Sequence, residues 1–440
     1  MHEPIIIVGA GAAGLMAARE LSAAGLPTLV LEATGHPGGR AHTLPAGDFS
    51  FPVEAGAEFI HGHLPLTLEL LKEAGIRHHP VKGEMLRVRK GEWLEGEIFT
   101  EGWDTLMGKM HALQEDLSVM DFLHTWFAGD RYAGLRDLVR RYAEGYDLVD
   151  MEKASTKALY REWQEEGEEQ YRIEGGYSRL AQWMVRDCEA RGAVFHFSCP
   201  VEEVAWERGR VRVAAGGQVF TGSKVIVTVP VSILREDLAA HQEALASDAV
   251  TGPLKGARGI LFTPAIPDYR QAAARLGYGT VTKVLLEFRE AFWNKQQENI
   301  GFILSDEAIP TWWTQCPDKT PLLTGWLAGT ALKALQGLTE EELVDRSLSS
   351  LASIFSIKAA LLKEQLVAAR ILDWSGAPFI RGGYSYDTVE SAEARKLLRR
   401  PLEDTLFFGG EALHEGRSPG TVEAAFTNGK EIAETIIARS

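Results

Sequence analysis

The sequence predicts an α/β protein, because a strand–loop–helix pattern stands at each end of the chain. Near the start, Ile5–Val8 is a continuous apolar run, as in parallel strands that are buried on both faces. Near the end, Phe407–Gly429 contains a short apolar run, a glycine-rich bend and the start of a helical pattern. At 440 residues the chain is longer than one typical domain, so two domains are expected.

The first glycine turn has the spacing of a dinucleotide-binding loop. Gly9, Gly11 and Gly14 form G-x-G-x-x-G directly after the first strand and before the helical pattern of Leu15–Ala24. In this motif the first glycine makes the tight turn, the second admits a pyrophosphate, and the third lets helix and strand pack closely. The helix N-terminus then faces the phosphates.

A second strand and a second glycine turn narrow the choice of dinucleotide. Thr28–Leu31 is the strand, and Glu32 follows it at the offset where a carboxylate accepts hydrogen bonds from ribose hydroxyls. An acidic residue there argues against a 2′-phosphate, so FAD or NAD is expected rather than NADP. The turn Gly38, Gly39, Arg40 favours FAD, because a guanidinium there could reach the same pyrophosphate. The alternative is a surface hairpin with an exposed arginine.

Composition and charge narrow the classes of function. The chain is 45% hydrophobic and 24% charged, as in soluble globular proteins, and its formal charge of −15 argues against binding nucleic acid. Cys188, Cys199 and Cys316 are isolated, so neither disulfides nor a metal site are expected. The first strand leaves no room for a signal peptide, and no apolar stretch approaches the ~20 residues of a spanning helix. We therefore expect a cytoplasmic protein that does not bind membranes.

Eight stretches, in order, resemble the flavin-containing amine oxidase family, which includes monoamine oxidases, polyamine oxidases and flavin-dependent histone lysine demethylases. They are VGAGAAGL, GGRAHT, EAGAEFIHG, IEGGYSRLAQWM, KVIVTVPVSIL, TKVLLEFREAFW, DWSGAPFIRGGYSY and FFGGEALHEGRSPGTVEAAFTNGKEIA. The resemblance implies a Rossmann-like FAD-binding domain of the glutathione reductase type, assembled from separated segments, beside an α+β substrate-binding domain. The FAD-binding domain is expected to comprise residues 1–75, 172–232 and 400–440, and the substrate domain residues 76–171 and 233–399.

The resemblance also explains why both ends of the chain carry similar elements. The first helix end reaches only the pyrophosphate of FAD, so the Gly410–Glu411 turn and a helix from near Thr421 are expected to hold the flavin half. Backbone N–H groups at Thr421 and Val422 would reach the flavin carbonyl, where a positive helix end stabilises the charge of the reduced ring. Val201 is expected beside the adenine, with an ordinary core residue as the alternative. The match places five further residues at the cofactor: Ala13, Gly56, Ala57, Glu58 and Trp374.

Three residues are expected on the catalytic side. From strand periodicity alone, Lys283 would lie on a solvated face, but the resemblance implies that it holds a water beside flavin N5 and assists reoxidation by oxygen. Tyr384 matches a tyrosine whose electron-rich ring guides the substrate amine. His61 is expected to hydrogen-bond the amine or to take its proton near neutral pH, with a histidine bound to a turn carbonyl as the alternative.

Two positions depart from the monoamine oxidase pattern. Gly383 stands where monoamine oxidases carry a cysteine that is bonded to the flavin, so FAD is expected to be bound non-covalently. Thr421 stands where their second cage tyrosine lies, so a two-ring aromatic sandwich is absent or is supplied from elsewhere. The stretches that contain these positions, RGGYSY and PGTVEAA, look closer to those of polyamine oxidases and histone demethylases.

The implied activity is amine oxidation. A hydride passes from the amine α-carbon to flavin N5, the imine hydrolyses to an aldehyde or ketone, and O2 reoxidises the flavin to give hydrogen peroxide. The expected partners are O2 and a small-molecule amine, and the sequence leaves open whether that amine is a monoamine, a polyamine or an amino acid. The alternatives are a protoporphyrinogen- or carotenoid-type dehydrogenase, or a non-catalytic redox-sensing flavoprotein. The helical segment Asp116–Glu144 belongs to the substrate domain or forms the face of a homo-oligomer.

Overall fold

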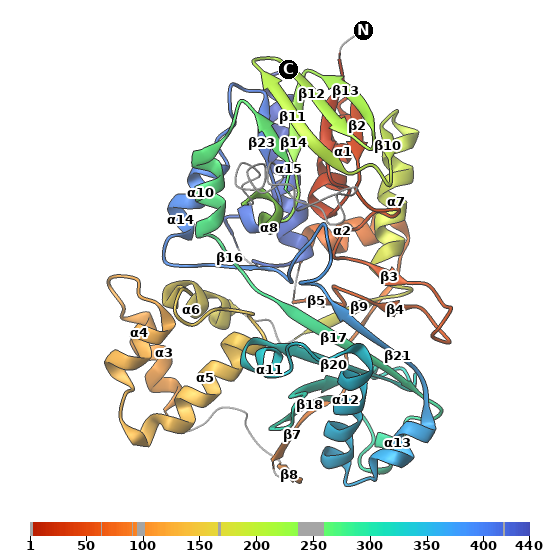
Figure 1. The fold of residues 1–440 in the computed structure, drawn as a ribbon, viewed down its shortest axis with the longest axis vertical. Coiled ribbons are helices and arrows are strands. Elements are labelled where there is room, and N and C mark those ends of the chain that lie inside the picture. Colours follow the sequence, from red (N-terminus) through yellow and green to blue (C-terminus); the bar gives the residue numbers. More distant parts are fainter. Residues whose placement is uncertain are drawn as a thin grey trace, which may run out of the picture.

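The structure is a computed structural model that describes residues 3–62, 64–89, 91–94, 102–165, 169–235, 259–416 and 419–440. These residues form two parts, which lie one above the other in Figure 1. The upper part holds a five-stranded sheet together with the first strand and the last helix of the chain, and the lower part holds a seven-stranded sheet beside a group of helices.

The upper sheet is parallel and is built from three separated stretches of the chain. The strand order is β10 (Val194–His196), β2 (Thr28–Leu31), β1 (Ile5–Val8), β14 (Lys224–Val227) and β23 (Leu406–Phe408). All neighbouring strands run parallel. The limits predicted for the first two strands are confirmed, and the two ends of the chain lie in one sheet.

Helices with many small residues cover one face of this sheet. They are α1 (Ala12–Ala23), α2 (Pro65–Ala74), α7 (Tyr177–Ala190) and α15 (Val422–Ile437). The first and last helices pack closely because a Cβ on Gly429 would lie 2.2 Å from the Ala13 carbonyl oxygen. Helix α1 begins three residues before the predicted Leu15, since the glycine motif already forms its first turn. The glycine loop is thereby fixed between sheet and helix.

The other face packs against a four-stranded sheet and further helices. The order is β13 (Gln218–Gly222), β12 (Arg210–Ala215), β11 (Val201–Glu207) and β15 (Leu261–Thr263), and α8 (Val231–Leu234), α10 (Pro267–Arg275) and α14 (Ser391–Leu398) lie nearby. Residues of β15, α10 and α14 share one hydrophobic core with the upper sheet. The packing therefore places them in the upper part, although the sequence assigned the whole of 233–399 to the substrate domain. The domain limits themselves stay a prediction.

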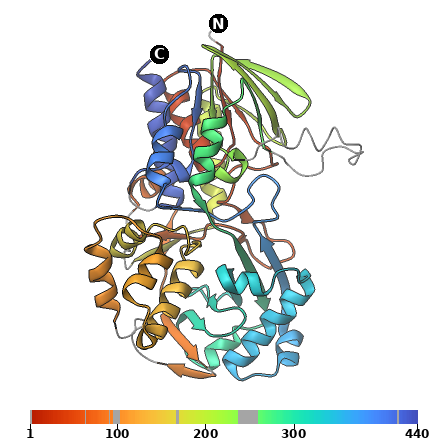
Figure 2. The ribbon, with the colours of Figure 1, turned by 60° about the vertical axis from the view of Figure 1, so that its left-hand side comes forward.

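The lower sheet has seven strands and carries two helices. The order is β21 (Leu366–Asp373), β17 (Val281–Phe288), β20 (Leu322–Ala328), β19 (Thr311–Trp313), β18 (Ile300–Ser305), β7 (Glu84–Arg89) and β8 (Glu92–Leu94). Helices α12 (Glu340–Phe355) and α13 (Ala359–Gln365) join its core, and α11 (Gly329–Ala334) follows β20. Every residue of β17 is buried, so Lys283 does not lie on a solvated face. Strands β17 and β21 extend toward the upper part in both views (Figures 1 and 2).

A group of helices completes the lower part. They are α3 (Trp103–His111), α4 (Val119–Trp126), α5 (Ala133–Gly145) and α6 (Thr156–Glu165), and they share one hydrophobic core. The segment Asp116–Glu144 thus contains two helices of this group, and its role in an oligomer stays a prediction. None of the helices in the described ranges combines the length and apolar character needed to cross a membrane.

Small sheets link the two parts. Strand β9 (Gln170–Ile173) pairs with both β5 (Phe59–His61) and β6 (His78–Pro80). Two further pairs are β3 (Thr43–Leu44) with β4 (Val53–Glu54), and β16 (Gly277–Tyr278) with β22 (Ser385–Tyr386). The residues that join the parts therefore lie next to the glycine loops of the upper sheet.

Candidate functional site

A cavity of about 2260 Å³ is lined by residues of both parts. Every residue that the sequence predicted at the site lines it, except Gly14. A Cβ on Gly14 would lie 1.9 Å from the Gly9 carbonyl oxygen, so this glycine serves the packing of α1 on β1. The structure thus brings together positions that are separated by most of the chain.

The glycine loop has the form of an anion cradle. Gly9 has φ +104°, which favours glycine, and no atom lies within 4 Å of the place where a Cβ on Gly11 would stand. Gly11 caps α1 without a side-chain hydrogen bond, so the first N–H groups of the helix stay open to the cavity, where Ala12 and Ala13 lie. This open space, next to a positive helix end, fits the diphosphate of a dinucleotide.

Glu32 stands at the end of β2 and is held by the protein. Its Oε2 accepts a hydrogen bond from the Ala10 N–H at 2.7 Å, and its Oε1 accepts from the Thr34 N–H at 2.8 Å and from Thr34 Oγ1 at 2.7 Å. Because Oε2 has a second lone pair, the carboxylate can still accept from a ribose hydroxyl. Val201, at the start of β11, lines the same end of the upper part.

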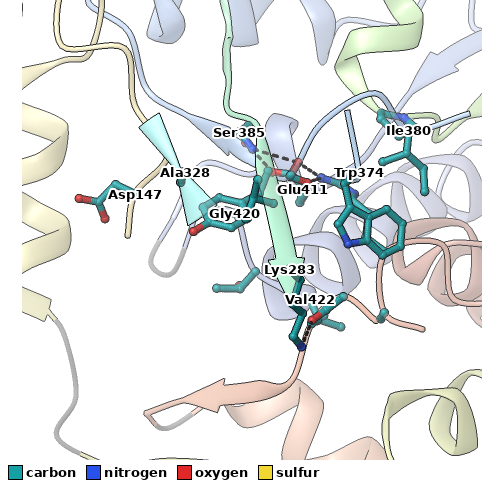
Figure 3. Close-up of a pocket in the computed structure, with 18 of the residues that line it drawn as sticks. Asp147, Lys283, Ala328, Trp374, Ile380, Ser385, Glu411, Gly420 and Val422 are labelled. Carbon is teal, nitrogen blue, oxygen red and sulfur yellow. Dashed lines mark hydrogen bonds and ion pairs between the residues drawn. The ribbon is translucent and has the colours of Figure 1, made fainter. Parts of the chain in front are cut away.

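Arg40 and Glu411 form an ion pair that ties together distant segments. Arg40 Nη1 donates to Glu411 Oε1 at 2.8 Å and to the Gly383 carbonyl at 2.7 Å. Glu411 Oε2 accepts from Ser385 Oγ, as Figure 3 shows. The guanidinium has five N–H donors, so the pair leaves donors for the diphosphate contact that was predicted. No sequence pattern indicated the Ser385 contact.

The loop that precedes β5 packs against the Arg40 turn. A Cβ on Gly56 would lie 1.8 Å from the Arg40 carbonyl oxygen and 3.2 Å from the Trp374 ring. The Trp374 Nε1–H donates to the Ala55 carbonyl at 3.0 Å. The cavity wall here is formed by Gly56, its neighbour Ala57 and Trp374. Only a glycine fits at position 56, where the wall contacts Arg40.

Helix α15 points its N-terminus at the cavity. Thr421 is the N-cap, and its Oγ1 accepts from the Ala424 N–H at 3.1 Å. The Val422 N–H precedes the first hydrogen bonds within the helix and lines the cavity. Beside it, the Gly410 N–H donates to Asn428 Oδ1 at 2.9 Å, which joins the glycine turn to the same helix. This arrangement suits a group that becomes negatively charged.

Glu423, in the first turn of α15, also caps another helix. Its carboxylate accepts from the Leu66 N–H at 2.9 Å and from the Thr67 N–H at 2.7 Å, at the start of α2. A charge there is favourable for both helix ends. The bond fixes α15 against the N-terminal segment.

Lys283 is buried, and its ammonium group makes three hydrogen bonds to the protein. Nζ donates to Glu58 Oε2 at 2.7 Å, to the Glu54 carbonyl at 2.8 Å and to the Gly56 carbonyl at 3.3 Å. The side chain is 1% exposed and lies 5.5 Å from the centre of the Trp313 ring. An ammonium group has three hydrogens, so these contacts engage all of them.

Glu58 is the centre of this polar network. Its Oε1 accepts from three donors: Arg172 Nε at 3.1 Å, Trp313 Nε1 at 3.0 Å and Gln315 Nε2 at 3.3 Å. Burial raises the pKa of Glu58, but Lys283 and then Arg172 outweigh it and lower the pKa to about 2. The carboxylate of Glu58 is thus held by protein groups. Its predicted role at the cofactor is therefore that of a residue in the cavity wall. Arg172, Trp313 and Gln315 were not among the predicted site residues.

Tyr384 and His61 lie near Tyr146, a residue that sequence reasoning missed. The Tyr384 hydroxyl donates to the Tyr146 carbonyl, and a Cβ on Gly420 would lie 3.1 Å from the Tyr384 ring. Burial raises the pKa of Tyr384 well above its usual value, so the phenol stays protonated. His61 Nδ1 lies 3.4 Å from the Tyr146 hydroxyl. The only available signal for Tyr146 was its position at the end of a predicted helix.

His61 is a neutral imidazole. Burial lowers its pKa to about 4, and its ring meets the Tyr146 ring edge-to-face at 6.1 Å. Of the two roles expected for it, hydrogen bonding to an amine is favoured over taking a proton near neutral pH, because a group with so low a pKa is a weak base. The aromatic residues Tyr142, Trp313 and Trp326 line the cavity nearby.

Fold and cavity together define a dinucleotide-binding α/β protein whose nucleotide site continues into an aromatic pocket. The sequence profile described as "Flavin containing amine oxidoreductase" matches residues 12–437. The chain therefore belongs to the flavin-containing amine oxidoreductase family, and its cofactor is FAD. The open space at Gly11, the carboxylate of Glu32 and the two helix ends fit that cofactor.

Similar proteins come from plants and bacteria. The chain is 26% identical to Lysine-specific histone demethylase 1 homolog 2 and to Polyamine oxidase 2 of Arabidopsis thaliana, and each alignment covers 98% of the chain. It spans 58% of the first and 87% of the second. The fold resembles putrescine oxidase with bound putrescine (TM-score 0.79, 22% identity, 100% of both chains). It also resembles cyclohexylamine oxidase from Brevibacterium oxydans IH-35A (TM-score 0.78, 20% identity, 100% and 99% of the two chains).

Proposed function

We propose that this protein is an FAD-dependent oxidase of small amines. The observation that carries the proposal is that the dinucleotide cradle and the residues Lys283, Tyr384 and His61 line one continuous cavity. The chemistry that the cofactor would supply is removal of a hydride from the amine α-carbon, which gives an imine, and transfer of the two electrons to O2, which gives hydrogen peroxide.

The residues of the aromatic pocket are suited to binding an amine. Tyr384 is held in place by its hydrogen bond to the Tyr146 carbonyl, and its ring offers an electron-rich face to a cationic or polar nitrogen. His61 is uncharged above about pH 4, so it does not repel an ammonium group and can accept a hydrogen bond from it. Such contacts orient the C–H bond and exclude water, which is most of what the reaction needs from the protein.

The packing around Gly383 supports non-covalent binding of FAD. A Cβ there would lie 2.6 Å from Leu148 Cδ1 and 2.9 Å from Val281 Cγ1, so a larger side chain would clash with the cavity wall. Glycine also offers no nucleophile. The position that carries a cysteine in monoamine oxidases therefore has neither the reactive atom nor the space for it.

An anaerobic screen tests the proposal. The FAD-loaded protein is mixed with putrescine, a longer polyamine, cyclohexylamine, an amino acid and a methyl-lysine peptide, and bleaching of the flavin absorbance is followed. We expect rapid bleaching by at least one amine and release of hydrogen peroxide when O2 is admitted. A porphyrinogen serves as the comparison substrate. If it bleaches the flavin and every amine fails, the protein is a dehydrogenase of another type.

A further inference from the structure

Lys283 forms an ion pair with the buried carboxylate of Glu58, and a lysine whose only role is to hold a water does not need such a partner. Glu58 and Lys283 belong to different parts of the molecule, since Glu58 precedes β5 and Lys283 lies in the middle of β17. Their side chains are 6% and 1% exposed, and the two charged atoms are 2.7 Å apart. Removing two charges from water costs much of what their attraction gains, so this ion pair contributes little to stability. A functional role of the pair is therefore expected.

The geometry leaves Lys283 little freedom in position or in protonation. Its three hydrogens point to three oxygen acceptors, of which one is a carboxylate, so an amine with a free lone pair would face an acceptor in at least one direction. Glu58 is fixed in turn by Arg172, Trp313 and Gln315. One carboxylate thereby fixes the place of the ammonium group.

Other charged groups around Lys283 leave the network positive. Arg172 lies 8% exposed on β9 and shares Glu58 with Lys283, so two cations surround one anion. The carboxyl group of Glu54, on β4, also interacts with Lys283, but burial raises its pKa to about 7 and reduces its charge at neutral pH. Within this group of side chains the two cations therefore outnumber the carboxylate that they share.

We propose that Glu58 is a positioning residue for the oxygen reaction: it holds the ammonium group of Lys283 at one place, with all three of its hydrogens on oxygen acceptors. The inference rests on the oxidase function proposed above. Reoxidation moves two electrons and two protons from the reduced cofactor to O2 to form hydrogen peroxide, and negative charge develops on the oxygen. A preorganised cation stabilises that charge without reorganisation.

The test follows reoxidation of the photoreduced, FAD-loaded protein by O2 between pH 6 and pH 10, so it needs no amine. In the wild type we expect a rate constant that is nearly independent of pH. In Glu58→Gln we expect the rate constant to fall toward about tenfold per pH unit above a new ionisation. Glu54→Gln is the comparison variant: it removes a carboxyl group that acts on Lys283 only through space, while the hydrogen bond from Lys283 to the Glu54 backbone carbonyl stays, so its profile should depend on pH less than that of Glu58→Gln.

A double variant separates action through Lys283 from a general effect on structure. In a Lys283→Met background, Glu58→Gln should change the rate constant no further. A flat profile in a folded, FAD-loaded Glu58→Gln protein would overturn the proposal, and so would an equal effect in the Lys283→Met background. If Glu58→Gln does not retain FAD, Glu58→Asp keeps the charge with a shorter reach, and a smaller change in the same direction is expected.

A second measurement is independent of turnover. Acetylation of the apoprotein at pH 9, mapped by mass spectrometry, should label Lys283 several-fold more in Glu58→Gln than in the wild type. Lys224, which pairs with Asp404 at 2.6 Å, is the internal control and should not change. If O2 fails to reoxidise the wild type, the oxidase function is wrong. The labelling then still decides whether Glu58 controls the protonation of Lys283, and equal labelling of the two proteins would overturn that.

Discussion

Glu54 should make the stability of this protein fall as the pH rises. Its carboxylate accepts from the Tyr177 N–H at 2.7 Å and from Thr43 Oγ1 at 2.8 Å. Burial nevertheless raises its pKa from 4.5 to about 7. The folded state therefore holds a proton that the unfolded chain releases above pH 4.5, and the unfolding free energy decreases between pH 4.5 and pH 7.

The size of the effect follows from the two pKa values. Each pKa unit corresponds to about 1.4 kcal/mol, so a change from 4.5 to about 7 corresponds to roughly 3 kcal/mol. Glu54 is only partly buried, so solvent screening makes this figure an upper bound. In Glu54→Gln the amide can accept from Tyr177 and donate to Thr43, so most of the local contacts are kept. The variant should match the wild type near pH 4 and be up to roughly 3 kcal/mol more stable at pH 8.

Urea unfolding of the FAD-loaded proteins at pH 4 and pH 8, followed by tryptophan fluorescence, measures this difference. Glu423→Gln is a control of opposite sign: its carboxylate accepts from two N–H groups and one hydroxyl of α2, and an amide nitrogen cannot replace those contacts. It should lose about 1–3 kcal/mol at pH 8. The reasoning about Glu54 would be refuted by a difference between variant and wild type that is the same at both pH values.

Three further outcomes are expected. Denaturation should release all the flavin into solution, because Gly383 offers no attachment point, and flavin that stays on the unfolded chain would contradict this. Gly11→Val should weaken FAD binding at least about tenfold while the apoprotein keeps its melting temperature, because the new side chain enters open space at the cradle. A fluorescence titration with FAD measures the affinity, and an unchanged affinity would show that the diphosphate does not lie at this loop. Tyr384→Ala should slow amine turnover while FAD stays bound, and full activity would exclude Tyr384 from the amine site.

The sequence was most informative where short-range chemistry decides the structure. The continuous apolar runs predicted the limits of β1 and β2, and the glycine spacing placed the cradle, because each depends on residues that are neighbours in the chain. No local sequence pattern could show that β23 pairs with β14 at the edge of the upper sheet. It followed only from the resemblance, which carries the long-range information that periodicity lacks.

The remaining features depend on contacts between distant segments. Alternation along β17 could not show that both of its faces are covered, so it pointed to a solvated Lys283. Glu58 meets Arg172 and Trp313 across separations of 114 and 255 residues, and no spacing rule connects them. The placement of β15, α10 and α14 on the upper sheet likewise depends on packing, because their local patterns would suit either part.

The position of β23 also affects how the chain must be made. Strand β14 has β23 as its neighbour on one side, and Val225–Val227 of β14 is buried in the finished sheet. A ribosome produces residues 406–408 long after β14, and until then that apolar edge is open to pairing with other chains. Domains usually fold as they emerge, but this one has to wait for its last strand. We therefore expect the sheet, and with it the cofactor site, to be completed only after the last residues have left the ribosome.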